Sequence, residues 1–205
     1  MRYGKLMTIM IAAWLASSSL MAGEFNQTLN IGDAAPAWEN LPGTDGKNHS
    51  LSELKDKEAI VLAFTCLSCP TAADYEERIN DLAKKYGGPN GKVGIVAVCV
   101  NRIAADRLDK LTEHARQQSL AFPIMYDESQ KIAKDYGALC TPEFYVLDKE
   151  RKIVYMGAMD DATDAPKVTQ RFVEEAVIAT LKKEVPAVKE TVPRGCLVRY
   201  ARERR

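Results

Sequence analysis

The chain has 205 residues, of which 46% are hydrophobic and 27% are charged. Lysine and arginine together number 28, and aspartate and glutamate also number 28, so the formal net charge is zero. This balance gives no indication of a nucleic-acid partner. The length is sufficient for one folded domain with a complete hydrophobic core.

Residues 1–22 have the pattern of a secretory signal. A positively charged start at Arg2 and Lys5 precedes a short apolar run and a suitable cleavage position at Ala22. The apolar run is shorter than the roughly 18 to 20 residues that a membrane span needs. We therefore expect cleavage, export to the periplasm or the extracellular space, and no stable membrane insertion afterwards. An uncleaved membrane anchor is the alternative.

Residues 23–205 are then expected to form a single domain that ends in a basic tail over 186–205. Five arginines follow Pro193 in this tail. We expect the tail to be a solvated terminus, and an acidic partner or a membrane surface is the weaker interpretation.

Apolar runs and helical periodicity alternate along the chain. We predict strands at 59–64, 93–100, 141–148 and 152–159, and an extended segment at 122–127. We predict one helix that starts at Pro70 and three further helices at 104–115, 128–137 and 172–181. The alternation in the first half indicates parallel strands with helices on the sheet faces, and the final hairpin adds an antiparallel edge. The expected fold is α/β, a three-layer α/β/α sandwich with a mixed central sheet.

The stretch "FTCLSCP" places Cys66 and Cys69 between the first predicted strand and the helix that follows it. The N–H groups and the positive dipole end of a helix N-terminus favour a thiolate over a thiol. We therefore expect the pKa of Cys66 to fall from about 8.5 into the range of about 3.5 to 7.5. Cys69, one helical turn further on and more buried, would resolve the mixed disulfide that forms on Cys66.

A zinc site and a structural disulfide are the alternatives for this cysteine pair. Zinc needs further ligands, and the two histidines of the chain, His49 and His114, have no neighbouring cysteine. A bridge between Cys66 and Cys69 closes too small a loop to constrain the unfolded chain much. Redox use is therefore favoured, and no metal ligand is predicted.

Three motifs in the order "FTCLSCP", "GALCTPEFYVLD" and "YMGAMDD" resemble the thioredoxin-like superfamily. The lead-in "IGDAAPAW" with "DGKNHSLSEL" resembles its redoxin branch, which includes the alkyl hydroperoxide reductases and thiol-specific antioxidant proteins. "PRGC" near the end resembles a bacterial exported subgroup that carries C-x-x-C-P. The resemblance covers residues 29–198 and implies a thioredoxin-like fold.

The resemblance also implies that the Thr141–Pro142 peptide bond is cis and faces the pair formed by Cys66 and Cys69. Such a turn would leave the Thr141 backbone free to pair with an extended substrate chain. Thr141 and Pro142 are therefore the expected substrate-binding residues.

The remaining cysteines are assigned less directly. Cys140 precedes Thr141, so it bridges to Cys196, acts as a third redox thiol, or is a buried free thiol. Cys99 lies in an apolar run and is expected to be an inert core residue. We expect Glu143 to be a solvent-facing strand residue, with a role as a proton acceptor as the alternative.

Three departures from related families bear on the activity. Leu67 and Ser68 replace the Gly-Pro of thioredoxin, so the direction of electron flow is not defined. The peroxiredoxin spacing Pro-x-x-x-Thr-x-x-Cys fails, because Thr65 lies one residue before Cys66 and four before Cys69. The copper-delivery proteins use C-x-x-x-C-P with a downstream histidine, which this chain does not match.

The sequence therefore predicts an exported thiol–disulfide oxidoreductase that exchanges electrons with protein dithiols or disulfides. Cys66 and Cys69 are its catalytic residues, and a membrane-bound electron donor is one candidate partner. No metal, organic cofactor or nucleic acid is expected. A thiol peroxidase with antioxidant activity is the alternative, and a non-catalytic thioredoxin-like binding or copper-carrier module is the second alternative.

Overall fold

A computed structural model of the chain describes residues 23–201. The expected signal segment 1–22 lies outside the described residues. Within the described part, no helix combines the length and apolar character that crossing a membrane requires.

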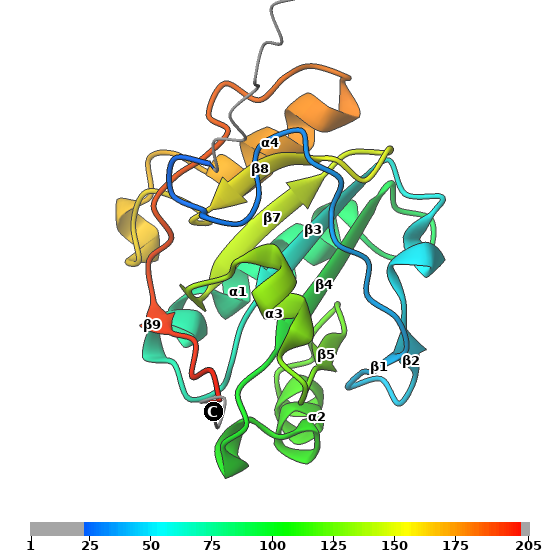
Figure 1. Ribbon diagram of the computed structural model, residues 1–205, viewed down its shortest axis with the longest axis vertical. Helices are drawn as coiled ribbons and strands as arrows, with labels where there is room; N and C mark the ends of the chain where they lie inside the picture. The colour runs from blue at the N-terminus through cyan, green and yellow to red at the C-terminus, as the bar shows by residue number, and fades with distance from the viewer. Residues whose placement is uncertain (1–22, 202–205) are drawn as a thin grey trace, which may run out of the picture.

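A five-stranded mixed sheet lies in the middle of the molecule, in the order β5–β4–β3–β7–β8 (Figure 1). Its strands are β3 (Ala59–Phe64), β4 (Val93–Cys99), β5 (Ile124–Tyr126), β7 (Glu143–Leu147) and β8 (Ile153–Gly157). β3, β4 and β5 run parallel, whereas β7 pairs antiparallel with both β3 and β8. Every residue of β3 is buried, as a continuous apolar run predicts for a central strand covered on both faces.

Helices cover both faces of this sheet. They are α1 (Pro70–Tyr86), α2 (Leu108–Gln117), α3 (Lys131–Tyr136) and α4 (Phe172–Leu181), with short 3-10 turns at η1 (Leu51–Leu54), η2 (Ala104–Asp106) and η3 (Ala165–Lys167). Side chains of α1, α2 and α4 share one apolar core, and α3 packs in the other with Trp38 of the N-terminal lead-in. The predicted three-layer α/β/α sandwich is confirmed.

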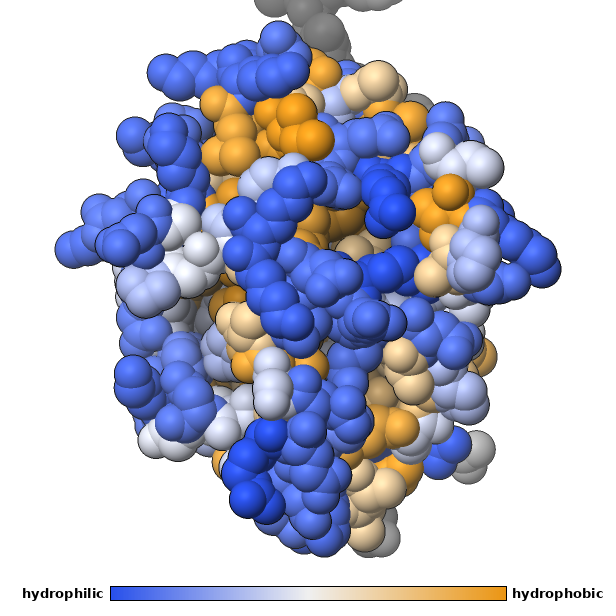
Figure 2. All heavy atoms as spheres, turned by 180° about the vertical axis from the view of Figure 1, so that it is seen from behind, coloured by the Kyte–Doolittle hydropathy of each residue, from blue (hydrophilic) through white to orange (hydrophobic). Residues whose placement is uncertain are grey.

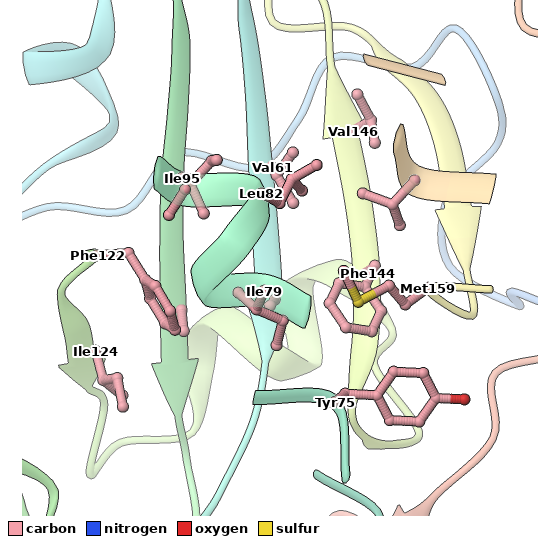
Figure 3. Close-up of a cluster of buried hydrophobic side chains, with 14 of the residues drawn as sticks. Val61, Tyr75, Ile79, Leu82, Ile95, Phe122, Ile124, Phe144, Val146 and Met159 are labelled. Atoms are coloured by element: carbon pink, nitrogen blue, oxygen red, sulfur yellow. The ribbon is translucent and has the colours of Figure 1, made fainter. Parts of the chain in front are cut away.

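The longest helix, α1, has clear start and stop signals. Pro70 occupies its first position, where the missing N–H group costs nothing, and Gly87 ends it with an N–H that bonds to the Ala83 carbonyl oxygen. Tyr75 and Ile79 lie on the face of α1 that packs against the sheet (Figure 3). Tyr75 is therefore a core residue at this position.

Seen from behind, the surface is mainly hydrophilic, with apolar side chains in separate patches (Figure 2). The most exposed large apolar side chain in the described chain is Leu197, at 78%. It belongs to the C-terminal tail.

Two small strand pairs were not predicted from the sequence. β1 (Leu41–Pro42) pairs with β2 (Asn48–His49), and β6 (Cys140–Thr141) pairs antiparallel with β9 (Cys196–Leu197). The second pair joins the tail to the loop that precedes β7 (Figure 1). The backbone of the described part of the tail is therefore paired with the domain, whereas the side chains of Cys196 and Leu197 are exposed to solvent, as expected for this terminus.

Candidate active site

The two cysteines of the C-x-x-C motif lie in the loop between β3 and α1. The helix begins at Pro70, with Cys69 as its N-cap residue and Cys66 in the preceding turn. Cys69 Sγ accepts the Ala72 backbone N–H at 3.4 Å. The helix terminus therefore stabilises a thiolate on Cys69 rather than on Cys66, which reverses the expectation from the sequence.

Cys66 is buried, with 5% of its surface exposed. Its Sγ lies 3.3 Å from Thr141 Oγ1 and 3.6 Å from Ser68 Oγ. Burial raises the pKa of the Cys66 thiol, and the side-chain hydrogen bonds between Cys66 and Thr141 and between Cys66 and Ser68 offset this only in part. The negative charge of Asp106 raises the pKa further. The expected lowering of the Cys66 pKa is therefore wrong, because desolvation outweighs these hydrogen bonds and the helix N-terminus contacts Cys69 instead.

Cys69 is more deeply buried, with 1% of its surface exposed. Burial on its own raises the pKa of this thiol, but hydrogen bonds from the Cys196 side chain and from backbone N–H groups outweigh it and lower the pKa. The same hydrogen bond raises the pKa of Cys196. Of these two touching thiols, Cys196 is the donor and Cys69 is the one that ionises first.

Thr141 contacts both cysteines of the motif. The Thr141–Pro142 peptide bond is cis, as the family resemblance implied. The Thr141 carbonyl oxygen accepts from Cys69 Sγ at 3.0 Å, and its Oγ1 contacts Cys66. Its backbone is not free, however, because Thr141 pairs with Cys196 in the β6–β9 ladder.

The disulfide suggested between Cys140 and Cys196 is not present, and both are free thiols. Cys140 lies opposite Leu197 in the ladder. Because neighbouring strand residues point to opposite faces, Cys196 shares a face with Thr141 and not with Cys140. Burial raises the pKa of Cys140 to about 12, with a further contribution from the charge of Glu143.

Asp106 is a buried carboxylate at the site that sequence reasoning missed. It accepts the Ser68 backbone N–H at 2.8 Å and the Ser68 hydroxyl at 2.6 Å, and Asn101 donates to it at 3.1 Å. Asp106 therefore fixes the turn between the two cysteines. The available signal was its place just after β4, because the carboxyl ends of neighbouring parallel strands meet at one edge of a sheet.

Glu143 is buried, so the expectation of a solvent-facing carboxylate is wrong. It accepts backbone N–H groups from Leu139 at 2.8 Å and Cys140 at 3.2 Å, and the Tyr145 hydroxyl at 2.7 Å. Burial raises its pKa, although these hydrogen bonds oppose the shift. Glu143 therefore holds the backbone just before the cis peptide bond.

A small hollow of about 90 Å³ lies beside Cys66. Glu76 and His114 line it, and His114 Nε2 lies 2.7 Å from Glu76 Oε2. His114, which the sequence did not place at the site, therefore lies near the first cysteine. Cys99 is fully buried, and burial raises its pKa, so it is a core thiol.

Among residues 23–201, no group of three or more histidine, cysteine, aspartate or glutamate side chains is arranged to hold a metal ion.

Known proteins share both the sequence pattern and the fold. Residues 30–171 match the family model described as Redoxin. A Mycobacterium tuberculosis protein named "Putative peroxiredoxin" is 28% identical over 142 residues, which cover 62% of this chain and 83% of that protein. The thiol-disulfide oxidoreductase ResA of Bacillus anthracis is 28% identical over 153 residues, covering 73% of this chain and 83% of that protein.

Solved structures extend this comparison. A hypothetical protein from Sinorhizobium meliloti superposes with a TM-score of 0.78 at 29% identity, covering 86% of this chain and 97% of that one. Thioredoxin-like proteins of lower identity share the same fold. The chain belongs to the Redoxin family, in the redoxin branch of the thioredoxin-like superfamily.

Proposed function

We propose that this protein is an exported thiol–disulfide oxidoreductase that exchanges electrons with protein dithiols and disulfides through Cys66 and Cys69. One observation carries the proposal. Cys66 Sγ lies 3.3 Å from Thr141 Oγ1, and Cys69 Sγ lies 3.0 Å from the Thr141 carbonyl oxygen. Both sulfur atoms are thus held on one residue beside the cis peptide bond. The proposed export rests on the signal-like pattern of residues 1–22.

In the oxidised protein, a partner thiolate attacks Cys66 Sγ. A sulfur–sulfur bond forms between the partner and Cys66 while the Cys66–Cys69 bond breaks, and Cys69 leaves as a thiolate. A second partner thiolate then attacks the partner sulfur of this mixed disulfide and releases Cys66. The partner gains a disulfide, the protein gains two thiols, and two electrons have moved; the reverse sequence oxidises the protein.

The two cysteines differ in a way that fits these roles. Cys66 lines the hollow beside Glu76 and His114, so it is the sulfur that a reagent approaches through that opening. Cys69 has the lowered pKa, and a thiol of lower pKa leaves faster in disulfide exchange. Attack on Cys66 with departure of Cys69 is therefore the favoured course.

Thr141 and Pro142 are the proposed docking residues for an extended partner chain. Because β9 pairs with Thr141 in this structure, a partner strand takes this edge only when β9 leaves it. Exchange of this kind requires no metal or organic cofactor, since a dithiol protein supplies both electrons. A membrane-bound dithiol donor is one such partner.

A thiol peroxidase is the second candidate function. The hollow at Cys66, with its Glu76–His114 pair, offers space for a small oxidant, and one relative is named a peroxiredoxin. In this reaction the Cys66 thiolate attacks one oxygen of the peroxide, the O–O bond breaks, and the other oxygen leaves as water or an alcohol, so that Cys66 becomes a sulfenic acid. The Cys69 thiol then condenses with it to form a disulfide and water. Sulfenic acid on Cys66 in a Cys69→Ser variant would identify this course.

A paired assay tests the proposal. Exchange with a fluorescent peptide disulfide and consumption of hydrogen peroxide are measured for the wild type, for Cys69→Ser and for the core control Cys99→Ser. We expect exchange to be lost in Cys69→Ser and kept in Cys99→Ser, with slow peroxide consumption throughout. Rapid peroxide consumption without exchange would favour the peroxidase. Absence of both, with copper retained on purification, would favour the carrier module.

A further inference from the structure

The C-terminal tail follows a fixed path to the site. Thr191 is bonded to the end of β8, where its N–H donates to the Met156 carbonyl oxygen at 3.1 Å. Beyond the site, the Val198 N–H donates to the Leu139 carbonyl oxygen at 2.9 Å, and the Tyr200 hydroxyl donates to Ala138 at 2.6 Å. The tail is therefore anchored on both sides of Cys196.

Gly195 brings the tail very close to the cis peptide bond. A Cβ atom on Gly195 would lie 2.0 Å from the Thr141 carbonyl oxygen and 3.0 Å from Pro142 N. These distances are too short for any side chain, so the tail reaches this position only with a glycine. The close approach sets Cys196 opposite Thr141, whose carbonyl oxygen also contacts Cys69.

Cys196 differs from the other four cysteines in its accessibility. Cys66, Cys69, Cys99 and Cys140 are all buried, whereas Cys196 is exposed. Cys196 lies opposite Thr141 in the ladder, and Thr141 bonds to both the Cys196 carbonyl oxygen and Cys69 Sγ. Cys196 therefore lies beside a sulfur that solvent does not reach, and it is itself open to solvent.

We propose that Cys196 is a third redox thiol. It transfers electrons by disulfide exchange between an external protein dithiol and the buried Cys69. This inference rests on the proposed function, because it needs the disulfide between Cys66 and Cys69. The Cys196 thiolate attacks Cys69 Sγ. The Cys69–Cys196 bond forms, the Cys66–Cys69 bond breaks, and Cys66 leaves as a thiolate. Cys66 then takes up one proton, which balances the proton that Cys196 lost.

The second half of the relay occurs at the surface. A partner thiolate attacks Cys196 Sγ and releases the Cys69 thiolate, which the Ala72 N–H stabilises. The second thiolate of the partner then attacks the partner sulfur that is bonded to Cys196. A disulfide forms within the partner, and Cys196 is released as a thiolate. Two electrons pass from the partner to the protein, and β9 stays paired with Thr141 throughout. A partner therefore has a route to the site that does not require the docking edge to open.

Tryptic mapping distinguishes the three relevant disulfides. Cys66 and Cys69 lie together in the peptide 58–78, Cys140 lies in 135–149, and Cys196 lies in 195–199. A Cys66–Cys69 bridge therefore stays within one peptide. A Cys69–Cys196 bridge joins 58–78 to 195–199, and a Cys140–Cys196 bridge joins 135–149 to 195–199.

The experiment uses the full chain, reduced and then equilibrated with oxidised glutathione, alkylated, and digested without reduction. We expect Cys66→Ser to yield 58–78 joined to 195–199. In contrast, 135–149 joined to 195–199, or only glutathione on Cys196, would overturn the inference. If the wild type forms the bridge within 58–78 while Cys66→Ser forms no joined peptide, the inference fails and the proposed function stands. If the wild type forms neither product, both fail.

A second variant tests the geometry without changing a cysteine. Gly195→Val introduces a side chain where the tail meets Thr141. It should abolish the joined peptides when combined with Cys66→Ser, and it should keep the bridge within 58–78 when Cys66 is present. Leu197→Ala is the matched control, since its exposed side chain lies on the same strand, and it should keep both products. Persistence of the joined peptides in Gly195→Val would contradict the role assigned to the tail.

Discussion

Thr141 and Cys196 are paired across β6 and β9, although they lie 55 residues apart in the sequence. The pairing places a tail cysteine on the residue that also contacts both sulfur atoms of the C-x-x-C motif. The edge that a partner chain would use is thereby occupied by the protein's own C-terminal segment.

Accessibility predicts the order in which the thiols react. At mildly alkaline pH, we expect iodoacetamide to modify Cys196 first, because it is the exposed cysteine of the five. Cys99, which is fully buried and has a raised pKa, should react only after unfolding. Time-resolved peptide mapping measures this order. Early modification of Cys99 would show that the core around β4 is not closed as described.

Asp106 has two predicted effects at the site. Its negative charge raises the pKa of Cys66, and its hydrogen bonds fix the turn at Ser68. Asp106→Asn keeps an oxygen for the Ser68 N–H and removes the negative charge. The pKa of Cys66 should therefore fall. The pH dependence of Cys66 alkylation, resolved from Cys69 by fragment ions, measures the change. Asp109→Asn, at an exposed position on α2, is the control and should leave the profile in place.

Glu143 is predicted to make stability fall as pH rises above the pKa of a glutamate in the unfolded chain. Its folded pKa is raised by burial, so the folded state binds more protons than the unfolded state in the window between the two values. Stability from this group is therefore full below the unfolded pKa and is lost as pH rises through the folded one.

Urea unfolding at several pH values tests this prediction. Glu143→Gln, which keeps an acceptor for the Leu139 and Cys140 N–H groups, should remove this part of the pH dependence. Glu143→Ala leaves those buried N–H groups without an acceptor and should lower the free energy of unfolding by about 1–3 kcal/mol. An unchanged pH profile in Glu143→Gln would contradict the assignment.

Arg78 is predicted to be important for stability through its nearly buried pair with Asp160. The side chains of Arg78 and Asp160 are 9% and 2% exposed, and Arg78 also donates to the carbonyl oxygens of Ala162 and Thr163. Arg78→Ala leaves Asp160 without its partner and should lower the free energy of unfolding by about 3–5 kcal/mol.

Lys85→Ala is the control substitution for Arg78→Ala. Lys85 lies on the same helix as Arg78, and it pairs at the surface with Glu174 of α4. Lys85→Ala should have little effect on unfolding in urea, because solvent screens exposed ion pairs. Equal effects of the two substitutions would contradict the importance given to the buried pair.

Local sequence patterns predicted the individual strands and helices well, because the pattern of each element lies in contiguous residues. The apolar run of β3 and the start of α1 at Pro70 are examples. The pairing of Cys196 with Thr141 depends instead on a distant contact that neither segment encodes alone. The pKa order of Cys66 and Cys69 was also missed, since it depends on burial and on where the helix begins.

The reduction potential of the pair formed by Cys66 and Cys69 tests the central claim most directly. The protein is equilibrated in glutathione buffers of graded potential, and peptide 58–78 is followed by mass spectrometry, with Cys66→Ser as the control. We predict a two-electron transition for the bridge within this peptide, which is lost in the variant. A midpoint of about −270 mV suits a reductant, and a midpoint of about −120 mV suits an oxidant. If no bridge forms between Cys66 and Cys69 at any potential, the dithiol mechanism is contradicted.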